Sequence, residues 1–187
     1  MRIVSGRFKG KAIAAPKSQM TRPTSDRLRE TIFNILDHGV AVDVEDARVL
    51  DLFAGTGALG LEALSRGARH CTFIEEGAEA RGVIRRNMEN FGLNGVAKIF
   101  RRDATRLGDA GTIEPFDLVF ADPPYGKALG EAALGSAVKG GWLKPEAICV
   151  LEERAGVEPD VPDCFSEIDR RLTGDSQVIF LRYQLAD

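Results

Sequence analysis

The sequence predicts an α/β fold built on a doubly wound, mostly parallel sheet. From residue 47 onward, short apolar or β-branched runs alternate with longer segments of helical periodicity, a pattern typical of βαβ units. A glycine-rich turn separates the first of these runs from the first helical segment. Near the C-terminus, two strand-like runs flank Thr173-Gly174-Asp175, which predicts an antiparallel hairpin at one edge of the sheet.

The order of the elements follows from apolar periodicity and from the Gly, Pro and polar residues that interrupt it. Helices are expected at 58–66 and 79–91. Strands are expected at 48–53, 71–75, 97–101, 116–121, 147–152, 166–172 and 177–183. These seven strands would form a sheet that is parallel through the fifth strand and ends in the antiparallel hairpin.

The first 40 residues differ from the rest in pattern and charge. Ile3-Val4 and Ala12-Ile13 flank a bend rich in Gly and Lys, which predicts a small hairpin, and residues 25–37 have helical spacing with Ser25 as N-cap. Residues 1–30 hold eight Lys or Arg against two acids, a net charge of +6, whereas the whole chain carries −3. We therefore predict a basic N-terminal appendage, 1–40, and a main domain, 41–187. The charge favours a polyanionic partner and a solvated basic arm about equally.

Composition argues against several classes of protein. The chain has 187 residues, 44% of them hydrophobic, which is enough for one sizeable core. Its apolar runs are too short to cross a bilayer and its basic start does not resemble a signal peptide, so a cytoplasmic location with no membrane partner is expected. A monomer is also expected. Three widely spaced Cys and two His fit free thiols better than a disulfide framework or zinc site, and no metal is expected.

The first candidate site lies where the first predicted strand gives way to the first helix. Gly55, Gly57 and Gly60 permit a tight turn and let a ligand approach the backbone amides. Glu75 lies 20 residues past Gly55, at the end of the second strand, where a carboxylate can accept hydrogen bonds from ribose hydroxyls. This spacing fits either a nicotinamide dinucleotide or S-adenosylmethionine. Asp51 favours the latter, because a carboxylate attracts an ammonium group and repels a pyrophosphate.

The second candidate site is Asp122-Pro123-Pro124-Tyr125, directly after the fourth predicted strand. Two fixed φ angles allow the Asp122 carboxylate and the Pro123 carbonyl to be held as acceptors in one small space. Two acceptors on the N–H groups of an aromatic amine help to localise its lone pair on nitrogen, and Tyr125 offers a stacking face for the base. The first and fourth strands of a doubly wound sheet are neighbours, so this tetrapeptide should face the glycine loop. Taken alone, the tetrapeptide also fits a rigid turn.

Other residues near the two motifs complete the predicted site. The tetrapeptide is predicted to be catalytic and to hold the amine for in-line methyl transfer. Asp103, after the third strand, fits an acceptor for an adenine amino group and a helix cap equally well. The predicted cofactor-binding residues are Asp51, Phe53, Ala54, Gly55, Thr56, Gly57, Glu75, Asp103 and Ala104.

Together these residues resemble the RsmD-like family of ribosomal RNA methyltransferases. The resemblance covers 2–11, 22–36, 52–68 and the Asp122 tetrapeptide, and so nearly the whole chain. Many amino-methyltransferases share the glycine loop and tetrapeptide, whereas 22–27 and 59–68 are more specific to this family. The resemblance implies a class I, Rossmann-like methyltransferase fold with a seven-stranded sheet and S-adenosylmethionine as donor. It also implies methylation of guanine N2 in 16S rRNA, at a site of the guanine-966 type.

The resemblance further implies that the basic N-terminal segment binds rRNA of the small subunit or of its assembly intermediate. The predicted RNA-contacting residues are Arg2, Arg7, Lys9, Lys11, Arg22, Thr24 and Arg27. Lys9 and Lys11 stand where relatives often have Arg, which removes bidentate phosphate contacts. Gly77 stands where many relatives have an acid, so contacts to the ribose or adenine are expected to differ. Arg22, Arg27 and Arg29 fit either phosphate contacts or salt bridges to acids on a helix face.

Three alternatives remain at this stage. A nicotinamide oxidoreductase would use the glycine loop but leaves Asp122-Pro123-Pro124-Tyr125 without a role. A non-catalytic RNA-binding assembly factor would keep the fold without the reaction. An amino-methyltransferase acting on another base, such as adenine at N6, would use the same clamp.

Overall fold

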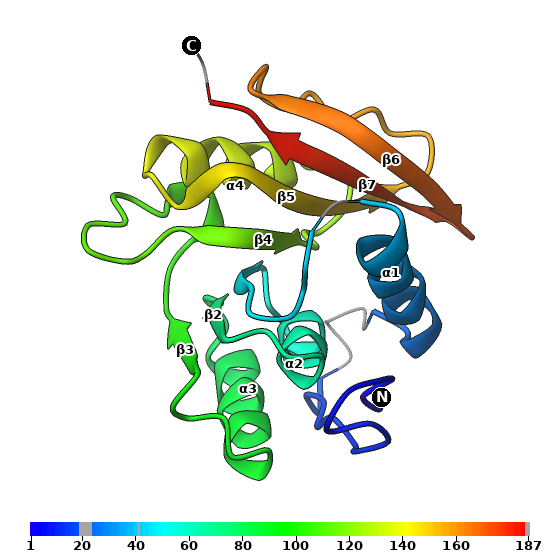
Figure 1. Ribbon diagram of the computed structural model, residues 1–187, viewed down its shortest axis with the longest axis vertical. Coiled ribbons are helices and arrows are strands. Elements are labelled where there is room, and N and C mark those ends of the chain that lie inside the picture. The colour runs from blue at the N-terminus through cyan, green and yellow to red at the C-terminus, as the bar shows by residue number, and fades with distance from the viewer. Residues whose placement is uncertain (19–23, 41, 186–187) are drawn as a thin grey trace.

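A seven-stranded sheet forms the centre of the molecule (Figure 1). The computed structural model describes residues 1–18, 24–40 and 42–185. The strand order is β3-β2-β1-β4-β5-β7-β6; the first five strands are parallel, and β7 runs antiparallel to both β5 and β6. The order reverses between β1 and β4, which is the switch point of a doubly wound sheet. The predicted α/β sheet with an antiparallel C-terminal hairpin is therefore confirmed.

The elements follow the predicted order. The strands are β1 Arg48–Leu52, β2 His70–Ile74, β3 Ala97–Phe100, β4 Phe116–Ala121, β5 Leu143–Arg154, β6 Phe165–Thr173 and β7 Ser176–Tyr183. The helices are α1 Asp26–His38, α2 Ala58–Ser65, α3 Ala78–Asn90, the short 3₁₀ helix η1 Ala104–Arg106, and α4 Leu129–Lys139. No helix in the described part of the chain is long and apolar enough to cross a membrane.

Two elements differ from the sequence-based expectation. β5 begins at Leu143, ahead of the predicted start at 147, and α4 was not predicted at all. The α4 sequence contains two glycines and has a weak helical signal. Its Ala133, Leu134 and Ala137 are nonetheless fully buried in the cluster that includes β4 and β5. Burial against the sheet, which no local pattern records, stabilises this helix.

The two faces of the sheet are covered by different elements. Neighbouring residues of one strand point to opposite faces, so Val49 belongs to one hydrophobic cluster and Leu50 to the other. The first cluster holds buried residues of α1, α2 and α3, and the second those of η1 and α4. Each face is thus closed by helices, as a parallel sheet requires. The three cysteines are free; two of them, Cys71 and Cys149, are buried, and Cys164 is partly buried.

The N-terminal segment packs against the sheet domain instead of extending away from it. Its predicted hairpin is a single antiparallel bridge between Arg2 and Ala12. Ile3 and Ile13, at 2% and 4% exposure, lie in the same hydrophobic cluster as Phe33 of α1. The segments 1–18 and 24–40 therefore share a core with the rest of the described chain. The division at residue 40 stays a prediction.

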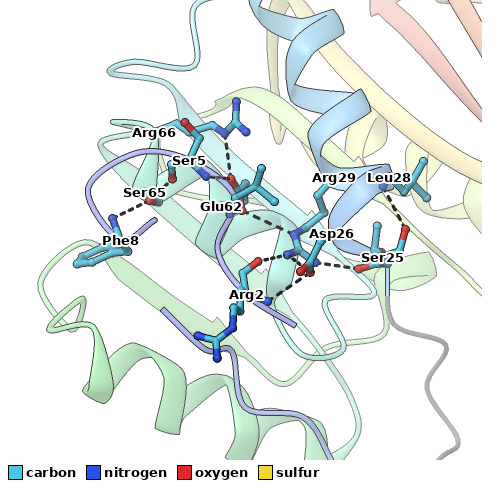
Figure 2. A network of polar contacts seen from close by, with 12 residues as sticks. Arg2, Ser5, Phe8, Ser25, Asp26, Leu28, Arg29, Glu62, Ser65 and Arg66 are labelled. Carbon is cyan, nitrogen blue, oxygen red and sulfur yellow. Dashed lines mark hydrogen bonds and ion pairs between the residues drawn. The ribbon is translucent and has the colours of Figure 1, made fainter. Parts of the chain in front are cut away.

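A buried polar network attaches this segment to α2 (Figure 2). Glu62 accepts hydrogen bonds from the backbone amides of Val4, at 3.0 Å, and Ser5, at 2.9 Å. Its carboxylate also pairs with Arg66 Nε at 3.1 Å and lies 3.7 Å from Nε of Arg29 in α1. Both Arg29 and Glu62 have fully buried side chains. For Arg29 the structure therefore decides between the two sequence interpretations: it pairs with acids and does not reach the surface to contact phosphate.

Candidate active site

A cavity of about 550 Å³ lies where the parallel strands end, at the switch point between β1 and β4. It is lined by residues of both predicted motifs, together with residues from the segment before α1 and from β5 and the β6–β7 turn. The predicted site residues that line it are Thr24, Asp51, Phe53, Ala54, Gly55, Thr56, Glu75, Ala104, Asp122, Pro123, Pro124 and Tyr125. The fold therefore brings the glycine loop and the tetrapeptide together.

The glycines of the loop have different roles: one lines the cavity, and another allows close packing of α2 on β2. Gly55, with φ of +58°, lines the cavity. Gly60 lies on α2, where a Cβ would stand 2.5 Å from Phe73 Cε1 and 2.6 Å from Cys71 Sγ on β2. Only glycine lets α2 pack this closely on β2. Gly57, at the N-cap of α2, is not among the residues that line the cavity.

Glu75 is oriented by two backbone amides. Its Oε2 accepts from the Gly55 amide and its Oε1 from the Gly77 amide, each at 2.8 Å. Each oxygen keeps a further lone pair that can accept from a ribose hydroxyl. A Cβ at Gly77 would lie 3.2 Å from Glu75 Oε1, so a side chain there would crowd the carboxylate. Where many relatives have an acid, this chain thus has a glycine whose backbone amide donates directly to Glu75.

Asp51 is a buried carboxyl at the end of β1. It is 2% exposed and accepts one hydrogen bond from the Gly60 amide, at 3.1 Å. Burial raises the pKa of Asp51 well above its ordinary value, and the nearby Glu75 raises it further. A cationic ligand beside Asp51 would lower this pKa and offset the cost of desolvation.

The charge of the cavity wall favours a cation. Five acids, Asp51, Glu75, Glu76, Asp122 and Glu152, line it, against one base, Arg102. Such a lining attracts a sulfonium or ammonium group and repels a pyrophosphate. Within the described residues, no group of His, Cys, Asp and Glu is arranged to hold a metal ion.

The tetrapeptide after β4 is held by β5 and by the segment before α1. The Asp122 Oδ2 atom accepts from the Thr24 hydroxyl at 3.1 Å. The Tyr125 hydroxyl donates to Glu152 Oε1, and the next residue, Gly126, donates its amide to Glu153 Oε1 at 3.0 Å. Desolvation and the neighbouring Glu152 carboxyl raise the pKa of Asp122 well above its ordinary value. The tetrapeptide is thus anchored on both sides.

Asp103 takes the capping role that the sequence left open. Its Oδ1 accepts from the backbone amide of Thr105, at 2.9 Å, and from the Thr105 hydroxyl, at 2.7 Å, at the start of η1. Asp103 does not line the cavity, whereas its neighbours Arg102 and Ala104 do. A contact between Asp103 and adenine stays a prediction.

Most predicted RNA-contacting residues lie on the surface, away from the cavity wall. Arg7 and Lys11 flank the Phe8 ring at 4.5 and 5.0 Å from its centroid. The exposed members of the set are Arg2, Arg7, Lys9, Lys11 and Arg27, and Arg22 lies outside the described residues. Thr24 differs from these: it is 9% exposed and bonds to Asp122 inside the cavity.

The sequence interpretation missed Glu152. This residue is 6% exposed and lines the cavity from the carboxyl end of β5. Ala121 of β4 is paired with Leu151 of β5, so Asp122 and Glu152 follow side by side. An acid at the end of a predicted apolar strand was the available signal, but the pairing of β4 with β5 was needed to interpret it.

Comparison with known proteins agrees with this arrangement. A family model described as "Conserved hypothetical protein 95" matches residues 1–182. The Escherichia coli (strain K12) protein named ribosomal RNA small subunit methyltransferase D is 36% identical over 185 residues, which are 98% of this chain and 89% of that protein. The chain belongs to this methyltransferase family.

Solved structures share the family fold. The Escherichia coli protein yhhF superposes with a TM-score of 0.83 at 32% identity, over 98% of both chains. SMU.776, solved in complex with SAH, has a TM-score of 0.63 at 15% identity, over 82% of this chain and 49% of that one. The fold is the class I methyltransferase fold, and the resemblance seen in the sequence is confirmed.

Proposed function

We propose that this protein transfers a methyl group from S-adenosylmethionine to the N2 amino group of a guanine in the rRNA of the small ribosomal subunit. The observation that carries the proposal is a single cavity in which the acid-lined glycine loop faces the Asp122 tetrapeptide. A donor site and an amine clamp that share one cavity provide what methyl transfer to nitrogen requires. The names of the relatives support rRNA as the substrate.

The cavity wall suits the proposed donor. S-adenosylmethionine, when bound, supplies a methyl group activated by a sulfonium charge. The Glu75 carboxylate holds the ribose hydroxyls, and Asp51 pairs with the ammonium group directly or through water. Gly55 lets the ligand approach the backbone, and the small side chain of Ala104 also lines the cavity. The same acids would repel the pyrophosphate of a nicotinamide dinucleotide, so an oxidoreductase fits this cavity poorly.

The tetrapeptide orients the amine. The Asp122 carboxyl and the Pro123 carbonyl accept from the two N–H groups of guanine N2, and Tyr125 stacks on the flipped base. Because the Tyr125 hydroxyl is bonded to Glu152, the hydroxyl end of its ring is held in place before the base arrives. Pro124 removes backbone freedom between the acceptors and the ring. Most of the rate enhancement then comes from positioning.

The exposed basic residues of the N-terminal segment would hold the RNA backbone. Arg7, Lys9 and Lys11 lie close together in the chain and are exposed. Phosphate contacts of this kind set the position of the RNA but carry no base specificity. Thr24, also in the N-terminal segment, donates its hydroxyl to Asp122. This hydrogen bond links the segment that holds the RNA to the residue that binds the amine.

The direct test maps the modified base. Labelled S-adenosylmethionine is supplied to the purified protein with small subunits that lack the modification, with naked 16S rRNA, and with assembly intermediates. Label in N2-methylguanine is the expected result, and comparison of the substrates identifies the preferred one. Label at adenine N6 would overturn the guanine assignment, and rRNA binding without any label would indicate a non-catalytic assembly factor.

Asp122→Ala tests the clamp. Loss of an acceptor that acts on the reacting amine should reduce methyl transfer by at least about 100-fold. Calorimetric binding of S-adenosylhomocysteine should be nearly unchanged, because Asp122 acts on the amine. Asp117→Ala, at the other end of β4 and paired with Lys144, is the matched control and should remain active. An active Asp122→Ala protein would remove Asp122 from the mechanism.

A further inference from the structure

Glu152 lies beside Asp122 at the carboxyl ends of two neighbouring strands. Ala121, the last residue of β4, pairs with Leu151 of β5. Asp122 and Glu152 are the residues that follow these two, and both line the cavity. Neighbouring strands are only about 5 Å apart, so side chains at such positions lie within reach of one small ligand. Glu152 therefore belongs to the part of the cavity that the proposed mechanism assigns to the reacting amine.

The two oxygens of the Glu152 carboxyl differ in their partners. Oε1 accepts from the Tyr125 hydroxyl. Oε2 is buried, and no N–H or hydroxyl group in the described part of the chain donates to it. A buried acceptor that lacks a donor is destabilising, and such an atom in a native structure calls for an explanation. In the wall of a substrate cavity, the explanation is a donor that arrives with the substrate.

This donor does not come from a basic side chain of the protein. Arg102 is the one base among the described residues that line the cavity. Its guanidinium donates to the carbonyl of Leu107 at 2.8 Å and lies 5.4 Å from the centroid of the Trp142 ring. Within residues 1–18, 24–40 and 42–185, no ion pair joins Glu152 to a base. An N–H group of the substrate fits the open acceptor instead.

Guanine carries such an N–H group next to the proposed methylation site. On the Watson–Crick edge of guanine, the N2 amine is followed by N1–H, which is a donor. The N6 amine of adenine and the N4 amine of cytosine are followed on that edge by a ring nitrogen that can only accept. A carboxyl oxygen beside the amine therefore stabilises guanine, whereas it repels the ring lone pair of adenine or cytosine.

We propose that Glu152 is the residue that selects guanine: its Oε2 accepts from N1–H while Asp122 holds the N2 amine. The proposal rests on the proposed function and names the side chain that gives this site its base specificity. The hydrogen bond from Tyr125 to Oε1 then orients the carboxyl and leaves Oε2 for the base. A site that is built to accept from a substrate N–H strongly rejects a base that lacks it.

Replacement of the target guanine by 2-aminopurine tests the proposal, because 2-aminopurine keeps the 2-amino group but has no proton on N1. RNA substrates with either base at the mapped position are compared in single-turnover methylation assays. The wild type should methylate guanine at least about 100-fold faster than 2-aminopurine. Glu152→Ala removes Oε2 and should reduce this ratio to about tenfold or less. Since 2-aminopurine also lacks O6, the part of the ratio that Glu152→Ala removes is the part that belongs to N1–H.

Two further variants separate base selection from a structural role. Tyr125→Phe keeps the ring and Oε2 of Glu152 and should retain a ratio well above that of Glu152→Ala. Glu146→Ala, at the exposed start of β5, is the matched control and should behave as the wild type. Calorimetric binding of S-adenosylhomocysteine should be unchanged in Glu152→Ala, which checks that the fold and donor site are intact.

Three results would overturn the inference. The first is an equal ratio in the wild type and Glu152→Ala, and the second is an equal fall in Tyr125→Phe and Glu152→Ala, which would mean that Glu152 acts through Tyr125. The third is equal rates on the two bases in the wild type, a result that depends on no variant. A wild type that leaves guanine N2 unmethylated would instead overturn the proposed function.

Discussion

Replacing Arg29 by Met should destabilise the protein by about 3 kcal/mol, the lower end of the cost of breaking a buried ion pair. The Arg29 side chain is fully buried, and its Nε lies 3.7 Å from the equally buried Glu62 carboxylate without a hydrogen bond. Glu62 would keep its other donors, the amides of Val4 and Ser5 and Nε of Arg66. Those three contacts are the reason for choosing the lower end of the range.

The loss has a second component in the backbone of the N-terminal segment. Arg29 donates to the carbonyl of Thr24 at 2.8 Å and to that of Arg2. Both carbonyls would lose this donor, and the segment would be less firmly held to α1 (Figure 2). Thr24 would then orient Asp122 less well, so methyl transfer should slow along with the loss of stability.

Thermal unfolding measures the effect. For a chain of this size, 3 kcal/mol corresponds to a fall in Tm of about 6–12 °C. Arg27→Met, on the exposed side of the same helix, is the control and should change Tm by a small fraction of that. The double variant Arg29→Met/Glu62→Gln should recover none of the loss, because Glu62 still pairs with Arg66 and a glutamine there offers only one acceptor oxygen for the amides of Val4 and Ser5. Equal Tm values for Arg29→Met and Arg27→Met would refute the reasoning.

Three further predictions follow from single contacts. Gly60→Ala should cost about 1–3 kcal/mol by overpacking against Phe73, and should weaken S-adenosylhomocysteine binding by shifting the glycine loop, both measurable by calorimetry; wild-type affinity would contradict it. Thr24→Val should slow methyl transfer by removing the hydroxyl that orients Asp122, and Thr24→Ser should restore most of the rate; equal rates would contradict this role. Burial lowers the pKa of His70 to about 4. The unfolded state therefore binds more protons than the folded state from about pH 6.5 down to pH 4, and stability should fall over this window by about 1–2 kcal/mol, discounted for partial exposure. His70→Gln should show a smaller fall in denaturant titrations.

The sequence predicted those features that depend on neighbours in the chain. Each predicted strand is an apolar run that a glycine or polar turn interrupts, and each was found within a few residues of its expected place. The Thr173-Gly174-Asp175 turn joins β6 and β7 as expected. The helix α4 was not predicted because its two glycines lower its helix propensity and its apolar residues form only a weak amphipathic pattern, so burial against the sheet has to stabilise it.

The candidate site likewise contains some residues that could be assigned from the sequence and others that required the structure. Asp51, Glu75 and Asp122 could be assigned because each lies near the end of a predicted strand or directly follows one, and the carboxyl ends of parallel strands meet at one edge. Glu152 met the same condition but was not recognised before the pairing of β4 with β5 was known. The role of Arg29 could not be chosen from the sequence, because its partner Glu62 lies on another helix.

The sequence by itself predicted the strands and, apart from α4, the main helices in their order along the chain, and it located the two motifs that line the cavity, since these depend on residue types at short spacing. Only the tertiary structure decided which side chains complete the site. Thr24 reaches Asp122 across 98 positions, and Tyr125 reaches Glu152 across 27. Contacts of this kind depend on how strands pair and how the N-terminal segment packs on α2, and packing is set by the whole core at once.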